Sequence, residues 1–113
     1  MSQFVFLYRS PPPGAISPQQ MQERMQRWQV WFKDVEKRGH LALYGHPLEP
    51  TGGGVVRDKN GNLTDGPYAE SKDIIMGFSV MEAKDFEEAV ALAKAHPIYD
   101  QGGVIEVRPV RKI

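Results

Sequence analysis

The chain has 113 residues, in which 14 lysines and arginines balance 14 aspartates and glutamates, and it contains no cysteine. This length predicts one domain, residues 1–113, with a hydrophobic core of its own. Because there is no net charge to attract nucleic acid or anionic membranes, we predict neither partner. The lack of cysteine excludes disulfides, thiolate nucleophiles and zinc–thiolate centres. No segment resembles a signal peptide or reaches the length of a membrane span, so we expect a soluble cytoplasmic protein.

A strand and a helix are predicted in the first third of the chain. The run from residue 4 to 9 is typical of a strand, and its two largely apolar faces predict a central strand covered on both sides. Ser17 then begins a helix as its N-cap, with Pro18 in the first helical position and Gln20 completing a capping box. An apolar stripe at helical spacing follows, formed by Met21, Met25, Trp28, Phe32 and Val35. Such a stripe either packs in the core, as most do, or lines a ligand pocket.

The middle of the chain predicts a short strand and a hairpin. The strand covers residues 41–44 and is ended by the Gly45-His46-Pro47 sequence. The glycine loop at 51–54 lacks the lysine and the following helix of a phosphate-binding loop, so we interpret it as a linker and predict no cofactor. Asn60-Gly61, between two short β-prone runs, is a strong turn signal and predicts a hairpin inserted at about residues 54–66.

A further strand is predicted over residues 74–82, with two unlike faces. One face is fully apolar and is expected to meet the helices; it carries Ile74, Met76, Phe78 and Val80. The other face includes Gly77 and Ser79, whose small side chains leave room for a cavity beneath a partner subunit.

The last elements define the fold class. Asp85 caps a second helix that ends near His96, before Pro97, and residues 104–110 form the last strand. Without the hairpin the order is βαββαβ, which predicts an α+β fold of the ferredoxin-like type. Two helices cover one face of its four-stranded sheet, so we predict a homodimer whose sheets face each other and form a dimeric α/β barrel.

A polar cluster follows the predicted hairpin. The proline of its Asp-Gly-Pro corner fixes the backbone and orients the residues around it. We predict that a small polar or anionic metabolite binds beside this corner, in contact with Asp65, Tyr68, Glu70 and Lys72. Each has a structural alternative: the aspartate binds its own turn rather than acting as a general base, the tyrosine packs in the core, and the glutamate and lysine form a solvated pair.

His96 and Arg9 are candidates outside the corner. His96 lies at a predicted helix C-terminus, where the helix dipole favours its charged form. There it either hydrogen-bonds the last carbonyl groups or acts as a titrating acid. Arg9 is a candidate anion anchor because its strand face is otherwise given to Val5 and Leu7. None of the three histidines has the spacing of a metal-ligand motif, so we predict no metal.

Several short motifs, taken together in this order, resemble the YCII-related proteins that are named for their DGPF motif. The first helix and the Gly-His-Leu sequence also fit, so the resemblance covers nearly the whole chain. The matching residues are Asp65-Gly66-Pro67-Tyr68-Ala69-Glu70-Ser71-Lys72, Gly77-Phe78, Glu88-Ala89, Ala93, Pro97, Gly103 and Glu106-Val107-Arg108-Pro109.

The resemblance implies a dimeric α/β barrel of ferredoxin-like type and no settled reaction. Some relatives are encoded beside, or fused to, extracytoplasmic-function sigma factors, which implies a link to transcription. The YciI-like branch resembles an enzyme with a His in its first helix and an Asp before a Pro; these positions fall near Trp28 and at His96 in this chain. Because neither residue is retained, acid/base catalysis here would rest on Asp65 and His96. The alternative is a non-catalytic accessory or regulatory dimerisation module.

Overall fold

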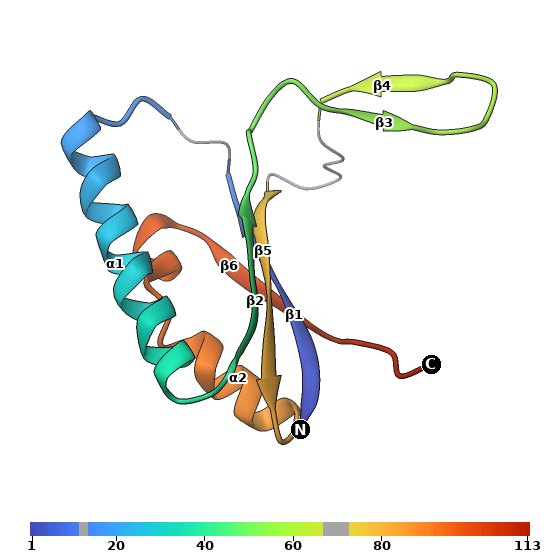
Figure 1. Ribbon diagram of the computed structural model, residues 1–113. Helices are drawn as coiled ribbons and strands as arrows, with labels where there is room; N and C mark the ends of the chain where they lie inside the picture. Colours follow the sequence, from blue (N-terminus) through green and yellow to red (C-terminus); the bar gives the residue numbers. More distant parts are fainter. Residues whose placement is uncertain (12–13, 67–72) are drawn as a thin grey trace.

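The computed structural model describes residues 1–11, 14–66 and 73–113. Across these residues the chain forms a four-stranded sheet, a separate two-stranded sheet, two α-helices and one 3₁₀ helix (Figure 1). Their bounds are β1 Ser2–Ser10, α1 Pro18–Lys37, β2 Leu41–Pro47, β3 Gly54–Val56, β4 Leu63–Asp65, β5 Ile74–Ala83, α2 Phe86–Lys94, η1 Pro97–Gln101 and β6 Val104–Pro109. No helix of this described part is long and apolar enough to cross a membrane.

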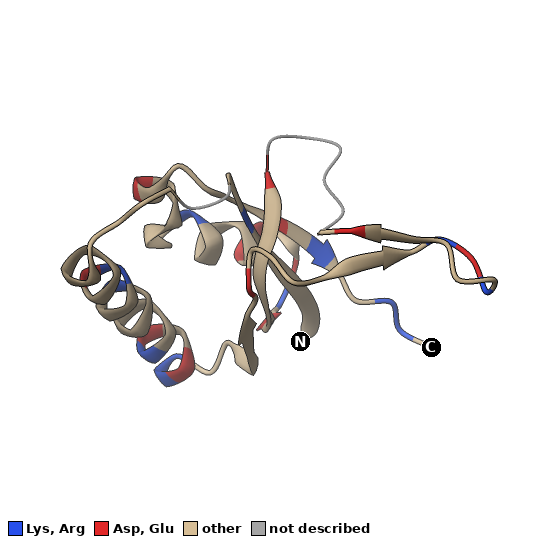
Figure 2. Ribbon diagram, turned by 90° about the horizontal axis from the view of Figure 1, so that it is seen from above, with Lys and Arg blue, Asp and Glu red and all other residues tan. Residues whose placement is uncertain are grey.

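The large sheet has the strand order β2-β5-β1-β6, and all its neighbouring strands are antiparallel. Both α-helices lie on one side of it, while the hairpin β3–β4 and the C-terminal segment project on the other side (Figures 1 and 2). This is an α+β architecture whose strand order is consistent with the predicted ferredoxin-like type. The prediction that the first strand lies centrally in the sheet is confirmed.

The two faces of β1 have different surroundings. Phe4, Phe6 and Tyr8 are buried on the side of the helices. Val5 and Leu7 alternate with them and point to the face that the helices leave open, where both are half-buried. In this single chain the helices therefore cover one face of the central strand, rather than both.

The prediction for the faces of β5 is wrong. Its buried residues include Gly77, Ser79 and Met81, whereas Phe78 and Val80 are only half-buried and lie on the open face. The pairing register gives the reason, because it sets two aromatic residues of β1 opposite the two small residues of β5, in the pairs Phe6–Ser79 and Tyr8–Gly77. A Cβ atom at Gly77 would lie 3.7 Å from the Tyr8 ring. The small residues thus make room for aromatic rings beneath the helices, and not for a cavity on the other side.

The start of α1 is as predicted, but its apolar stripe is only partly so. The Ser17 hydroxyl accepts the backbone N–H of Gln20 at 3.1 Å, and the Gln20 side chain accepts that of Ser17 at 3.0 Å. Trp28, Phe32 and Val35 of the stripe pack in or against the core as predicted. Met21 and Met25 are exposed. Figure 1 shows why: α1 tilts away from the sheet toward its N-terminal end.

The second strand is longer than predicted and continues through the Gly45-His46-Pro47 sequence to Pro47. Gly45 does not end it, because this residue adopts a φ of +72° at an irregular position in the pairing. A Cβ atom there would lie 1.8 Å from the Phe78 carbonyl oxygen, so only glycine allows β2 to stay against β5.

Candidate functional site

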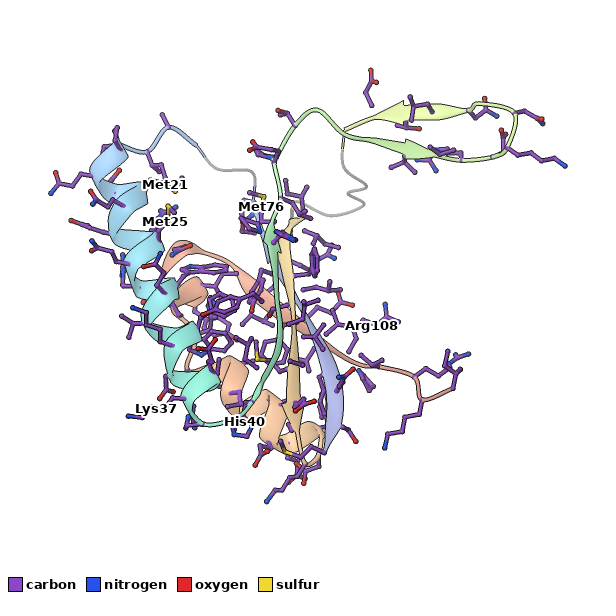
Figure 3. All side chains as sticks on the ribbon, in the orientation of Figure 1. Met21, Met25, Lys37, His40, Met76 and Arg108 are labelled. Atoms are coloured by element: carbon purple, nitrogen blue, oxygen red, sulfur yellow. The ribbon has the colours of Figure 1, made fainter. Side chains whose placement is uncertain are left out.

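The layer between α1 and the sheet holds a cluster of five rings. Figure 3 shows side chains filling this layer. The ring centroids of Tyr8 and Trp28 are 4.9 Å apart. The ring centroid of His96 lies 4.3 Å from that of Trp28 and 4.5 Å from that of Trp31. Phe32 closes the group, with its ring centroid 5.1 Å from that of Trp31. We call these five residues the aromatic cluster.

His96 is the polar centre of this cluster. It lies between α2 and η1, where its Nδ1 accepts the backbone N–H of Ile98 at 2.9 Å and so caps η1. Because Nδ1 is the acceptor, the neutral ring carries its proton on Nε2. That Nε2 atom is buried and has no hydrogen-bond partner among the described residues. The cluster therefore contains a buried N–H donor that has no partner among the described residues.

Burial also decides the charge of His96. Its side chain is 3% exposed, and this desolvation lowers its pKa from 6.5 to about 3. The prediction that the helix dipole favours the charged form is therefore wrong, because desolvation outweighs the dipole. Nor does the ring bind helix carbonyl groups; it accepts an N–H group at the start of the next helix. His96 is a neutral hydrogen-bond donor at ordinary pH.

A second polar group lies beside the histidine, on the sheet. The hydroxyl groups of Tyr8 and Ser79 are 2.5 Å apart, and both residues are fully buried. Burial raises the pKa of the Tyr8 phenol, so it stays protonated. The pair has two hydroxyl protons, and its mutual hydrogen bond uses one of them. The other is available to a third atom.

The structure brings together the two positions that the resemblance relates to an enzyme. Trp28 on α1 and His96 before Pro97 meet edge to face, with an angle of 90° between their rings. If the resemblance holds, an indole stands near the place of the His of the YciI-like branch, and a neutral imidazole stands at the place of its Asp. Neither group gains or loses a proton readily near neutral pH, so this pair can bind a ligand but is poorly suited to acid/base exchange.

Two other predicted site residues, Asp65 and Arg9, lie outside the aromatic cluster. Asp65 is exposed at the end of β4, on the far side of the sheet from α1 (Figures 1 and 2), so the structure does not bring it to His96. Arg9 lies on β1, and its Nη1 donates to Glu106 Oε1 at 3.4 Å in a partly exposed ion pair. Three further predicted residues lie outside the described residues: Tyr68, Glu70 and Lys72.

Sequence reasoning missed three members of the site, which are Tyr8, Trp31 and Ser79. Trp31 is 5% exposed, and its Nε1 donates to the Leu92 carbonyl at 3.2 Å, which ties α1 to α2. Its spacing of three residues from Trp28 and four from Val35 is a helical signal that could have found it. Ser79 carries no such signal, because a single serine in a strand acquires its role only from the residue opposite.

A groove and the histidine and acidic side chains are further candidates among the described residues. A broad, open groove of about 830 Å³ lies between α1, which contributes Arg27 and Trp31, and the end of α2 with the start of η1, which contribute Ala95 and Pro97. Its lining includes Trp31 but neither His96 nor the Tyr8–Ser79 pair. No group of three or more histidine, aspartate or glutamate side chains in the described part of the chain is placed to hold a metal ion.

Comparisons with known proteins place the chain in a family. No protein with a curated description matches it. A solved structure of 5-chloro-2-hydroxyhydroquinone dehydrochlorinase from Burkholderia phenoliruptrix, in complex with 2,5-dihydroxybenzoquinone, is similar to it with a TM-score of 0.53 and 20% identity. The match covers 98% of this chain and 93% of the other, which supports the same fold. The sequence model of the YCII-related domain matches residues 3–113, and the chain therefore belongs to the YCII-related domain family.

Proposed function

We propose that this protein binds a small, planar, polar molecule within the layer between α1 and the four-stranded sheet. The observation that carries the proposal is the unpaired Nε2–H of His96, buried among aromatic rings. A buried donor without a partner costs about 1–3 kcal/mol, and a ligand that brings an acceptor oxygen would recover this energy. The spare hydroxyl proton of the Tyr8–Ser79 pair would be a second donor to such a ligand.

The surrounding rings favour a flat ligand. Indole and phenol faces stack well on planar molecules, and tryptophan and tyrosine dominate many recognition sites for this reason. The dehydrochlorinase that shares the fold was solved with 2,5-dihydroxybenzoquinone, a flat ring that bears acceptor oxygens. This supports the same ligand class here, without implying the same reaction. Simple acid/base catalysis, as predicted from the sequence, would then depend on groups that the ligand meets beyond the cluster.

The N-terminal end of α1 offers a route into the layer. Met21 and Met25 are exposed there, and Figure 3 shows them on the side of α1 that faces the sheet, at the same end as Met76 of β5. Methionine side chains are flexible and unbranched, so they adapt to a passing ligand at low energetic cost. We propose that the ligand enters at this end.

Tryptophan fluorescence tests the proposal directly, because the two tryptophans of the chain, Trp28 and Trp31, both belong to the cluster. We expect 2,5-dihydroxybenzoquinone to quench the wild-type protein saturably, while p-xylene, a flat ring without acceptor oxygens, does not bind. N-acetyltryptophanamide, titrated in parallel, corrects for absorption of light by the quinone. Absence of saturable quenching in the wild type would overturn the proposal for this ligand class.

Two substitutions then locate the site. Tyr8→Phe removes the hydroxyl that could donate to the ligand and should weaken binding about tenfold, the effect of losing roughly one hydrogen bond of 1.4 kcal/mol. Asp65→Asn tests the predicted corner site and should bind like the wild type if the cluster is the site. The reverse pattern would move the site to the corner at Asp65, where the sequence predicts it.

A second proposal concerns the open face of the sheet. Directly opposite pairs on β1 and β5, Val5–Val80 and Leu7–Phe78, form a half-buried apolar patch there. We propose that this patch joins two copies of the chain, sheet to sheet, as in the predicted dimeric α/β barrel. A non-catalytic accessory or regulatory role, including the link to sigma-factor-dependent transcription that the resemblance implies, would rest on this surface and not on the cluster.

Sedimentation of wild type and Leu7→Asp tests the dimer. The wild type should sediment as a dimer at micromolar concentration, and Leu7→Asp should shift it to a monomer by burying a charge at the centre of the contact. Val30→Asp is a matched control, because Val30 lies on α1, on the other side of the sheet from the open face, and is 69% exposed. A wild type that stays monomeric at high concentration, or a Leu7→Asp variant that stays dimeric, would contradict this proposal.

A further inference from the structure

The hairpin β3–β4 has almost no cover within its own chain. Of residues 51–65, all but Val55 are exposed. Val56 and Leu63 stand directly opposite each other in the pairing, so their side chains lie on the same side of the hairpin. They are 73% and 62% exposed. The hairpin thus presents a pair of adjacent apolar side chains to solvent.

Polar bonds nevertheless fix the shape of this hairpin. The Asp58 carboxylate accepts the backbone N–H of Asn60 at 2.8 Å and also the side-chain amide of Asn62, and these bonds lower its pKa. Arg57 Nε donates to the Thr64 hydroxyl at 2.8 Å across the two strands. The hairpin is therefore built as a defined element, with its loop and both of its strands tied together.

A two-stranded hairpin that packs against nothing is marginally stable in water. Its two outer edges and its apolar pair need cover, which the polar bonds within the hairpin do not supply. The described residues of its own chain do not provide this cover, since the hairpin is exposed on both faces. A second molecule that lies against the hairpin would supply this cover and explain why its two strands stay paired.

The shape of the chain indicates which molecule that is. The Cα radius of gyration is 15.5 Å, against about 13 Å for a compact domain of this length. The hairpin and the C-terminal segment extend the chain, because both project from the side of the sheet opposite α1 (Figures 1 and 2). The half-buried patch with Leu7 and Phe78 lies on that same side. The hairpin and the apolar patch therefore lie on the same side of the sheet.

We propose that the hairpin is an intersubunit arm, which packs the side bearing Val56 and Leu63 against a second copy of this chain. One twofold contact would then cover the open sheet face and the hairpin of both copies together, because an isologous interface uses the same surfaces twice. This inference rests on the sheet-to-sheet dimer proposed above, and it assigns the hairpin a function in that dimer.

Cross-linking of the unmodified protein tests the arm. Lys59 lies in the hairpin loop, so a short amine-reactive cross-linker can report what the hairpin tip touches. In an equal mixture of ¹⁵N-labelled and unlabelled protein, we expect cross-links from Lys59 to the body of the chain to join peptides of different isotope content. If the protein is dimeric and Lys59 forms only same-isotope cross-links, the arm is overturned while the dimer stands.

The double substitution Val56→Asp/Leu63→Asp measures the contribution of the arm. We expect it to raise the dissociation constant of the dimer at least tenfold in sedimentation, with the far-ultraviolet circular dichroism of the body retained. Val30→Asp again serves as the control at a similarly exposed valine, and it should leave the constant unchanged. An unchanged constant in the double variant would overturn the arm alone, whereas a monomeric wild type would overturn both the arm and the dimer.

Discussion

The two faces of the four-stranded sheet are made from alternate residues of the same strands, yet different surroundings complete them. The helix-covered face carries Phe6, Tyr8 and Met81, all of them buried by helices of the same chain. The open face carries Leu7 and Phe78, which are only half-buried, with the partly exposed Arg9–Glu106 ion pair at its side. The comparison indicates that one face holds the chain folded, while the other is available to a second molecule.

Adjacent residues of β1 give the largest expected difference between the faces. Phe6→Ala should lower the free energy of unfolding by about 3–5 kcal/mol, because it removes a fully buried ring and leaves a cavity. Leu7→Ala should lower it by only about 1 kcal/mol in the diluted, monomeric protein. Urea unfolding of both variants at submicromolar concentration measures this difference. Equal losses would mean that the open face is covered within the single chain.

The stability of the protein should depend on pH through His96, which packs on the helix-covered side of the sheet. The pKa of His96 is about 3 in the folded protein and 6.5 in the unfolded chain, so below pH 6.5 the unfolded chain binds a proton that the folded protein does not. Stability is therefore lost as the pH falls, by about 2 kcal/mol between pH 7.5 and 5.0. His96→Gln should abolish this part of the loss, whereas His46→Gln, at an exposed position opposite Phe78, should retain it.

Urea unfolding at the two pH values provides the measurement. The change between pH 7.5 and 5.0 is taken within each protein, so the cost of the substitution itself cancels. A His96→Gln variant with the full wild-type pH dependence would mean that His96 reaches solvent in the folded protein. Such a result would contradict the burial of His96 on the helix-covered side of the sheet.

Local signals allowed much of the fold to be predicted from the sequence. The Ser17 capping box and the Asp85 cap each depend on residues within a few positions, and both are present in the structure, which also pairs β3 with β4 on either side of Asn60-Gly61. The faces of β5 could not be assigned in this way. Hydropathy favours Phe78 for the core, but the aromatic rings of the neighbouring strand already fill the helix-covered face and leave space only for side chains such as that of Ser79.

The candidate site was harder to predict, because its parts come from distant segments. His96 and Trp28 are 68 positions apart in the sequence and meet only through the packing of α1 against the turn before η1. The helix-dipole argument for His96 failed because it considers the helix end and not the rings that bury the side chain. The role of Asp65 as a site residue stays a prediction, and the binding experiment with Asp65→Asn tests it.

Polar pairs give the smallest expected difference between the faces. In a double-mutant cycle, Tyr8→Phe and Ser79→Ala should show a coupling energy of about 1 kcal/mol, because their hydrogen bond is fully buried. The cycle of Arg9→Ala and Glu106→Ala should give no more than about 0.5 kcal/mol, since water screens this partly exposed pair.

Salt separates these two pairs more cleanly than the coupling energies do. Raising the ionic strength from 0.1 to 1 M shortens the Debye length from about 10 Å to about 3 Å, which should remove most of the Arg9–Glu106 coupling. The neutral hydroxyl pair on the helix-covered face should keep its coupling unchanged. If the Arg9–Glu106 coupling instead resists salt and increases with protein concentration, a second copy of the chain must shield it from water. That outcome would place the ion pair inside the proposed sheet-to-sheet contact rather than at its rim.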